Sequence, residues 1–202
     1  VLPPYPNPKR IPMARVAVVY HSGYGHTKKQ AEAVFAGVQN AGAEAHLISV
    51  ADVNDDTWAL LAGVDAIVFG APTYMGGVSG DFKKFADASS KAWFTGAWKD
   101  KIAAGFTNSA STNGDKFSSI QYLWTLSQQH GMIWVGTGMM PASSKAATRN
   151  DINYLGGFGG ALSQSPSDAS PEEGPLPGDL ETAKLFGERV VAITNQFVRG
   201  RQ

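Results

Sequence analysis

The stretch "VAVVYHSGYGHTKKQAEAV" (Val16–Val34) passes from an apolar run, through a small polar loop, into a helical pattern. The apolar run, residues 14–20, is rich in β-branched residues and does not alternate with polar ones. Such a run is typical of a strand buried on both faces of a parallel sheet. The apolar residues that follow recur at helical spacing and predict a helix over residues 27–41, closed by Gly42.

The same alternation of strand and helix continues along the chain. Further strands are predicted over residues 44–50, at a run that ends near Gly70, and over residues 101–107 and 131–138. The intervening helices are predicted over residues 57–62, 80–92, 116–129 and 179–198. Five strands alternating with helices predict an α/β fold, a doubly wound five-stranded parallel sheet with helices on both faces. Residues 139–178 have no strong period, and a connection of that length is usually functional or disordered.

The bulk composition excludes several classes of protein. The chain has 202 residues, of which 43% are hydrophobic, and its 17 basic and 17 acidic residues cancel. The chain therefore has no net positive charge that would favour binding to nucleic acid or to an anionic membrane. It also has no apolar run of about 20 residues, which a membrane span would need. The absence of cysteine excludes disulfides and cysteine-ligated metals. We expect a soluble cytoplasmic protein, with residues 1–12 as an N-terminal extension, Met13 as a candidate start and residues 13–202 as a single domain.

Three loops with the same character follow the first, third and fourth predicted strands. They read "HSGYGHT" (residues 21–27), "APTYMGGVSG" (71–80) and "TNSASTNGD" (107–115), and all are rich in glycine, small and hydroxylated residues. Ligands of doubly wound sheets bind outside the carboxyl ends of the strands. Three such loops at one edge therefore favour a single composite site over three independent turns.

The first loop is a candidate anion site. Its amides and hydroxyls precede a helix, where unpaired N–H groups and the helix dipole favour negative charge. It is not a Walker A loop, and it lacks both G-x-G-x-x-G and the G-x-S-x-G of hydrolases. A tight turn that needs glycine for positive φ remains the alternative.

The other two loops suit a flat heteroaromatic ligand. Glycines of the second loop let the backbone approach such a ligand, and Tyr74 or Met75 could cover its face. A plain flexible loop is the alternative here. The third loop supplies hydroxyl and amide groups, which suit a ring edge or sugar hydroxyls better than a metal. Its one carboxylate is Asp115, and no cluster with metal-ligand spacing is present.

The stretches "YHSGYGHT" (20–27), "GAPTYMGGVSGDFKKFAD" (70–87), "AWFTGAWKDK" (92–101), "QHGMIWV" (129–135) and "NYLGGFGGAL" (153–162) resemble the WrbA-type NAD(P)H:quinone oxidoreductases of the flavodoxin-like superfamily. The resemblance runs from Met13 to the final helix. It implies a flavodoxin-like fold, non-covalent FMN, NAD(P)H as electron donor and a small-molecule quinone as acceptor of two electrons in ping-pong order. It also implies a homo-oligomer, either a dimer or a tetramer.

The resemblance also assigns residues to the parts of the FMN site. The phosphate-binding loop corresponds to Ser22, Gly23, Tyr24, Gly25, His26 and Thr27. The loop that holds the isoalloxazine ring corresponds to Pro72, Thr73, Tyr74, Met75, Gly76 and Gly77. The far side of the ring and the ribityl chain correspond to Thr107, Asn108, Ser109, Ser111, Thr112, Asn113 and Gly114.

Three aromatic residues complete this assignment. Tyr24 would stack near the nicotinamide or quinone. His130 corresponds to a histidine that faces the flavin, where it would stabilise charge or donate a proton. Trp93 corresponds to an aromatic residue that a neighbouring subunit places over the substrate. A histidine that caps a strand is the alternative for His130, and ordinary packing is the alternative for Trp93.

The sequence departs from the family pattern in ways that leave the substrate open. The second loop reads P-T-Y-M-G-G where the family usually has P-T-R-F-G-N, and the third loop has fewer glycines. Two other functions remain as alternatives to the oxidoreductase. One is a flavodoxin-type one-electron carrier, against which zero net charge argues because such carriers dock through acidic surfaces. The other is a non-enzymatic flavin-binding or scaffold protein.

Overall fold

The computed structural model describes residues 13–201, so the predicted extension, residues 1–12, lies outside the described residues. A parallel sheet forms the middle layer, and its strand order β2-β1-β3-β5-β6 confirms the predicted doubly wound arrangement. Strand order reverses between β1 and β3, which is where such sheets bind ligands. The five strands are β1 (Arg15–Tyr20), β2 (Glu44–Ser49), β3 (Ala66–Tyr74), β5 (Ile102–Ser109) and β6 (Ile133–Trp134).

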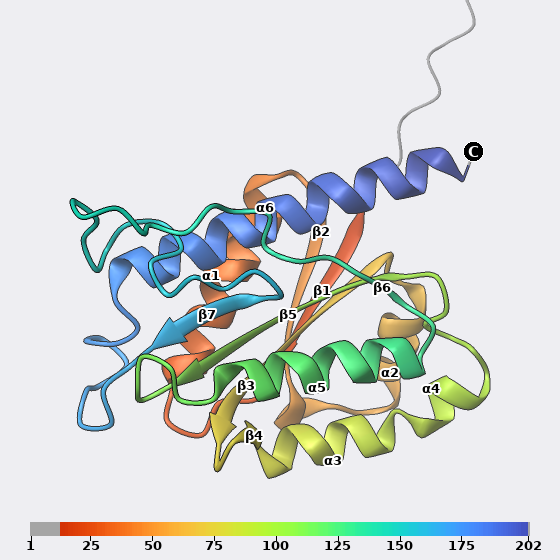
Figure 1. Cartoon of the computed structure of the whole chain (residues 1–202). Coiled ribbons are helices and arrows are strands. Elements are labelled where there is room, and N and C mark those ends of the chain that lie inside the picture. Colours follow the sequence, from red (N-terminus) through yellow and green to blue (C-terminus); the bar gives the residue numbers. More distant parts are fainter. Residues whose placement is uncertain (1–12, 202) are drawn as a thin grey trace, which may run out of the picture.

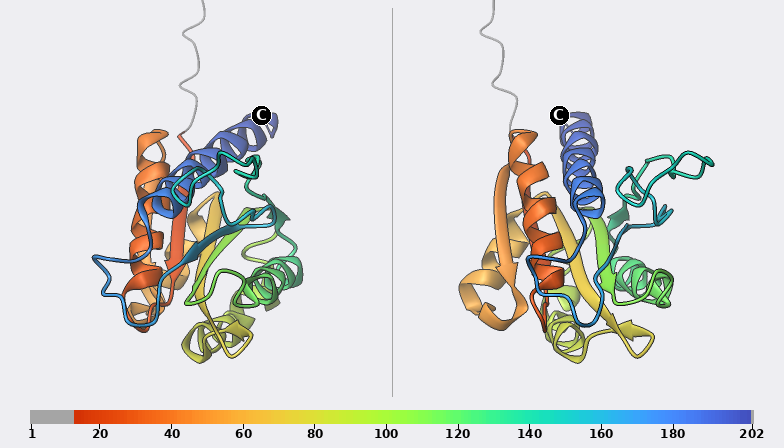
Figure 2. Two further views of the ribbon diagram at one scale, coloured as in Figure 1. Left: turned by 60° about the vertical axis from the view of Figure 1, so that its left-hand side comes forward. Right: turned by 90° about the vertical axis from the view of Figure 1, so that its left-hand side faces the viewer.

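Helices cover both faces of this sheet (Figures 1 and 2). Alternate side chains of β1 point to opposite faces, so Val16 and Val18 enter one apolar cluster and Ala17 and Val19 enter the other. The first cluster lies under α1 (His26–Asn40) and α6 (Pro177–Gly200), and the second lies under α2 (Asp55–Gly63), α3 (Gly80–Ala88) and α5 (Lys116–Gln129). A short 3-10 helix, η1 (Val50–Asp52), links β2 to α2.

Strand β3 is longer than predicted. The expected end near Gly70 is wrong, because the strand continues to Tyr74 and folds back as β4 (Gly77–Val78). Met75 and Gly76, both with positive φ, form the two-residue turn. Prolonging β3 moves this hairpin beyond the sheet edge, where it becomes a wall of the site described below.

The fifth position of the sheet is shared by two segments, which the sequence did not predict. The predicted strand 131–138 reduces to β6, which pairs only with the start of β5. The far half of β5 pairs instead with β7 (Ala161–Gln164), from the stretch in which no strand was predicted. Gly160 permits this pairing, because a Cβ there would lie 2.4 Å from the Gly105 carbonyl oxygen. Residues 136–160 therefore form an excursion between the two halves.

The helix predicted over residues 80–92 is two helices, α3 and α4 (Ser90–Phe94). The buried Ser89 lies between them, and its hydroxyl donates to the Ala86 carbonyl. No helix within residues 13–201 has the length and apolar character that a membrane crossing requires.

Candidate functional site

A cavity of about 530 Å³ opens at the carboxyl edge of the sheet. Figure 1 shows the ends of β3, β5 and β7 pointing toward this edge, at the lower left. All three predicted loops contribute to it, as the composite-site interpretation requires. Its walls are Ser22, Tyr24, His26, Thr27, Pro72, Thr73, Tyr74, Asn108, Ser109, Ala110, Ser165, Ser167 and Ala169.

The first loop forms the end of the cavity that suits an anion. Gly25 has φ 92°, a left-handed conformation that starts α1, and its N–H donates to the Ser22 hydroxyl at 3.0 Å. The amides of the first helical turn have no partner within the helix, and no acidic residue in that turn competes for them. Because Ser22 accepts from the loop, its own proton is free for a ligand. The buried Thr27 adds a second hydroxyl.

The second loop supplies the aromatic mouth of the cavity. The rings of Tyr24 and Tyr74 meet edge to face, with centroids 6.2 Å apart. The Tyr74 hydroxyl lies against Gly23, where a Cβ would come within 2.5 Å of it. Met75, at the tip of the hairpin, is fully exposed. Gly76 and Gly77 shape this tip and do not line the cavity.

Two buried threonines join the second and third loops behind the cavity wall. The Thr73 hydroxyl lies 2.8 Å from that of Thr107 and donates to the Ser119 hydroxyl at 2.7 Å. Thr107 is fully buried and does not line the cavity. Its side chain therefore fixes β3 to β5, whereas the sequence predicted a contact with the ligand.

Asn108, in the third loop, is held by two serine hydroxyls. Its Oδ1 accepts from the hydroxyls of Ser163 at 2.8 Å and Ser165 at 3.0 Å. With Oδ1 so engaged, its amide NH₂ is the part left to donate into the cavity. Of the other predicted residues, Ser109 lines the cavity, and the following ones form a turn beside it, namely Ser111, Thr112, Asn113 and Gly114.

A fourth wall was missed by the sequence analysis. Ser165, Ser167 and Ala169 follow β7, and the Ala169 carbonyl lies 2.8 Å from His26 Nε2. Pro171 packs against Gly25, so the tail closes over the first loop. The stretch "SQSPSDAS" (residues 163–170) is rich in hydroxyl groups like the other three loops. This composition is the sequence feature that could have indicated a fourth wall.

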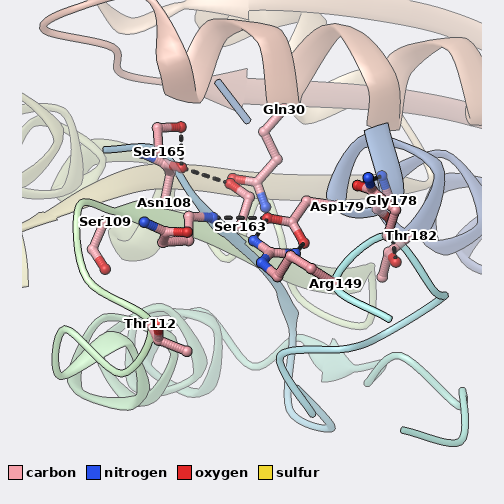
Figure 3. Close-up of polar contacts among 12 residues, drawn as sticks. Gln30, Asn108, Ser109, Thr112, Arg149, Ser163, Ser165, Gly178, Asp179 and Thr182 are labelled. Carbon is pink, nitrogen blue, oxygen red and sulfur yellow. Dashed lines mark hydrogen bonds and ion pairs between the residues drawn. The ribbon is translucent and has the colours of Figure 1, made fainter. Parts of the chain in front are cut away.

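An ion pair with a buried carboxylate and a partly exposed guanidinium holds this fourth wall to the sheet (Figure 3). Arg149 and Asp179 form two parallel hydrogen bonds of 2.7 and 2.6 Å. The Asp179 carboxylate also accepts from the backbone N–H of Gln164 in β7 at 2.9 Å. One carboxylate thus fixes α6, the excursion and the strand that leads into the wall.

His130 and Trp93 do not lie at this cavity. Within one chain they line a separate hollow of about 360 Å³, at the end of α5 remote from the third loop. His130 Nε2 lies 2.8 Å from the Ser89 hydroxyl, and its ring packs on Trp98 with centroids 4.2 Å apart. Burial lowers the pKa of His130 to about 4, so the ring is neutral at pH 7.

A family model described as a flavodoxin domain matches residues 17–121, slightly more than half of the chain. The chain belongs to the flavodoxin family. Flavodoxin FldP of Pseudomonas aeruginosa is 51% identical over 92% of this chain and 99% of that protein. An NAD(P)H dehydrogenase (quinone) of Geotalea uraniireducens is 31% identical, over 92% of this chain and all of that protein. A WrbA-like flavodoxin from Agrobacterium tumefaciens, a solved structure, superposes with a TM-score of 0.71 at 45% identity, over 91% and 98% of the two chains.

These relatives confirm the resemblance to WrbA-like flavodoxins and imply a flavin. The cavity fits FMN in its chemistry. None of its lining residues carries a carboxylate, ammonium or guanidinium group. A helix N-terminus with two hydroxyls suits one phosphate. The amide of Asn108 and the neighbouring hydroxyls suit sugar hydroxyls and a heteroaromatic ring.

Proposed function

We propose that this flavodoxin-family protein is an FMN-dependent NAD(P)H:quinone oxidoreductase. The observation that carries the proposal is the uncharged cavity with a phosphate cradle at one end and exposed tyrosines at its mouth. Tyr24 has 76% of its surface exposed, so a second flat molecule can reach it. When bound, FMN supplies the ring that accepts a hydride from NAD(P)H and passes it to a quinone.

The residues of the chain have distinct tasks in this proposal. Ser22 and the first turn of α1 bind the phosphate. Asn108 orients the ribityl chain or ring edge through its amide. Tyr24 and Tyr74 exclude water from the mouth and stack near the nicotinamide or quinone. His130 is neutral in the single chain at pH 7, so there it holds no surplus proton for a substrate.

The proposed site is completed by a second copy of the chain. Trp93 is 52% exposed and Phe94 is 84% exposed, and both lie on α4. This aromatic surface and the hollow beside His130 are remote from the cavity of their own chain. We assign them to the cavity of a neighbouring copy in a homodimer or homotetramer, as the resemblance to the family implies.

Light scattering after gel filtration tests this assembly. We expect wild-type protein to elute as a dimer or tetramer and Trp93→Ala to shift toward monomer, because a large interface aromatic is lost. Trp93→Phe is the matched control and retains the oligomer. A monomeric wild-type protein would remove both Trp93 and His130 from the site.

A one-electron carrier is the second candidate, and the relative named flavodoxin FldP favours it. The two functions differ in their electron donor. An oxidoreductase takes a hydride directly from NAD(P)H, whereas a carrier takes single electrons from a partner protein. Neutral net charge supports the oxidoreductase, since steering to a basic partner needs an acidic surface.

Anaerobic stopped-flow mixing with NADH and with NADPH distinguishes these candidates. We expect the absorbance of bound FMN to bleach in a single fast phase with at least one nucleotide. Turnover with benzoquinone should then exceed that of free FMN at equal concentration. Persistence of the flavin band with both nucleotides would favour the carrier, and turnover no faster than free FMN would favour a scaffold.

A further inference from the structure

Lys116, the first residue of α5, is buried under the loop 109–115, whose first residues line the cavity, and it has no role in the function proposed above. Its surface is 1% exposed. Its Nζ donates to the carbonyls of Ser111 at 2.6 Å, Thr112 at 2.9 Å and Asn113 at 3.4 Å. An ammonium has three donors, so all of them are used within one loop.

The loop is folded around this ammonium. Gly114 and Asp115 have φ of 54° and 52°, so the chain reverses immediately before α5. A left-handed conformation costs Asp115 about 1 kcal/mol and persists where the surroundings impose it. The Ser109 hydroxyl donates to the Ser111 carbonyl at 3.1 Å, which ties the start of the loop to the same point.

The three carbonyls that face the ammonium set the direction of the neighbouring amides. In a trans peptide the N–H points opposite to the C=O. The amides of Thr112, Asn113 and Gly114 therefore point away from the ammonium, and none donates to a group within residues 13–201. Consecutive free amides form a donor set for an electron-rich ligand. They follow Ser109 and Ala110, which line the cavity.

The ammonium also brings charge to the loop beside the cavity. Within the described part of the chain, no carboxylate forms an ion pair with Lys116. The charged groups that face it are Asp179 and Arg149, which pair with each other. A buried charge compensated by carbonyl dipoles alone is unusual. Burial lowers the pKa of Lys116 to about 8.

We propose that Lys116 is a positioning residue for the cofactor: it shapes the loop 109–115 so that its free amides meet the electron-rich edge of the FMN ring, and it places a positive charge beside that edge. The inference rests on the proposed function only in taking FMN as the ligand. It requires neither NAD(P)H nor a quinone, so a carrier would use Lys116 in the same way.

The test compares FMN binding and FMN midpoint potential in Lys116→Met, Lys116→Arg and wild type. We expect Lys116→Met to raise the FMN dissociation constant about tenfold. Its midpoint potential becomes more negative, because reduction adds negative charge where a cation has been lost. Lys116→Arg restores both values toward wild type. Lys83→Met, a loss of one exposed lysine on α3, is the matched control and changes neither.

The pH dependence of the wild type tests the same inference without a variant, should Lys116→Met fail to fold. Between pH 7 and 9.5 the neutral form of Lys116 becomes dominant, so FMN affinity should fall severalfold in wild type and stay constant in Lys116→Arg. Identical pH profiles, or a Lys116→Met variant with wild-type affinity and potential, would overturn the inference. Wild-type protein that binds no FMN at all would overturn the proposed function together with it.

Discussion

Replacing Ser22 and Thr27 together with alanine is expected to weaken FMN binding about a hundredfold. Each hydroxyl lines the phosphate end of the cavity, and a hydrogen bond to a charged group contributes about 1.5–3 kcal/mol. The variant also loses the contact between Ser22 and the Gly25 N–H, which fixes the loop. Fluorescence titration of apoprotein with FMN measures the loss.

The fold should survive this double substitution. Both changes remove small groups at the end of the sheet, so the far-UV circular dichroism and the melting temperature should remain close to wild type. Ser118→Ala, an exposed hydroxyl on α5, serves as the control and leaves FMN affinity unchanged. If the double variant bound FMN as tightly as wild type, "HSGYGHT" would be a turn and no more.

The Asp179→Ala variant should lose about 3 kcal/mol in free energy of unfolding. Removing one partner of a buried ion pair leaves the other charge without compensation, which costs about 3–5 kcal/mol. The lower value is appropriate because the Arg149 side chain is 26% exposed while that of Asp179 is 4% exposed. The N–H of Gln164 loses its acceptor as well. Urea unfolding followed by tryptophan fluorescence measures the difference.

The same variant should bind FMN more weakly, because β7 leads into the wall formed by Ser165 and Ser167. Asp168→Ala removes an exposed carboxylate that does not line the cavity, and this control should be neutral in stability. A loss of less than about 1 kcal/mol in Asp179→Ala would mean that the ion pair does not hold the tail.

The elements with strong sequence patterns were predicted well. The run 14–20 is apolar without alternation because both faces of β1 are covered by helices. β7 was not predicted because it has only four residues and follows a glycine run, which is too short a stretch to show the alternation of a strand. The apolar run 131–138 predicted one full strand. The sheet edge is instead completed by two segments, a feature that depends on pairing far apart in the sequence.

The part of the site that lies directly after the strands was predicted from the sequence. The three loops meet because carboxyl ends of parallel strands share an edge. Thr107 shows the limit: it has the right residue type, yet its hydroxyl points to Thr73 behind the wall. The tail serines reach the cavity only through tertiary contacts such as the pair between Arg149 and Asp179. The assigned roles of His130 and Trp93 depend on a second copy of the chain, and they stay predictions.

Titration of the apoprotein with FMN tests the central claim most directly. We expect saturation at one FMN per chain, quenched flavin fluorescence and a dissociation constant in the micromolar range or below, about −8 kcal/mol or stronger. Riboflavin, which lacks the phosphate, should bind far more weakly because the cradle of Ser22 and α1 stays empty. No saturable binding of FMN, or equal affinity for FMN and riboflavin, would contradict it.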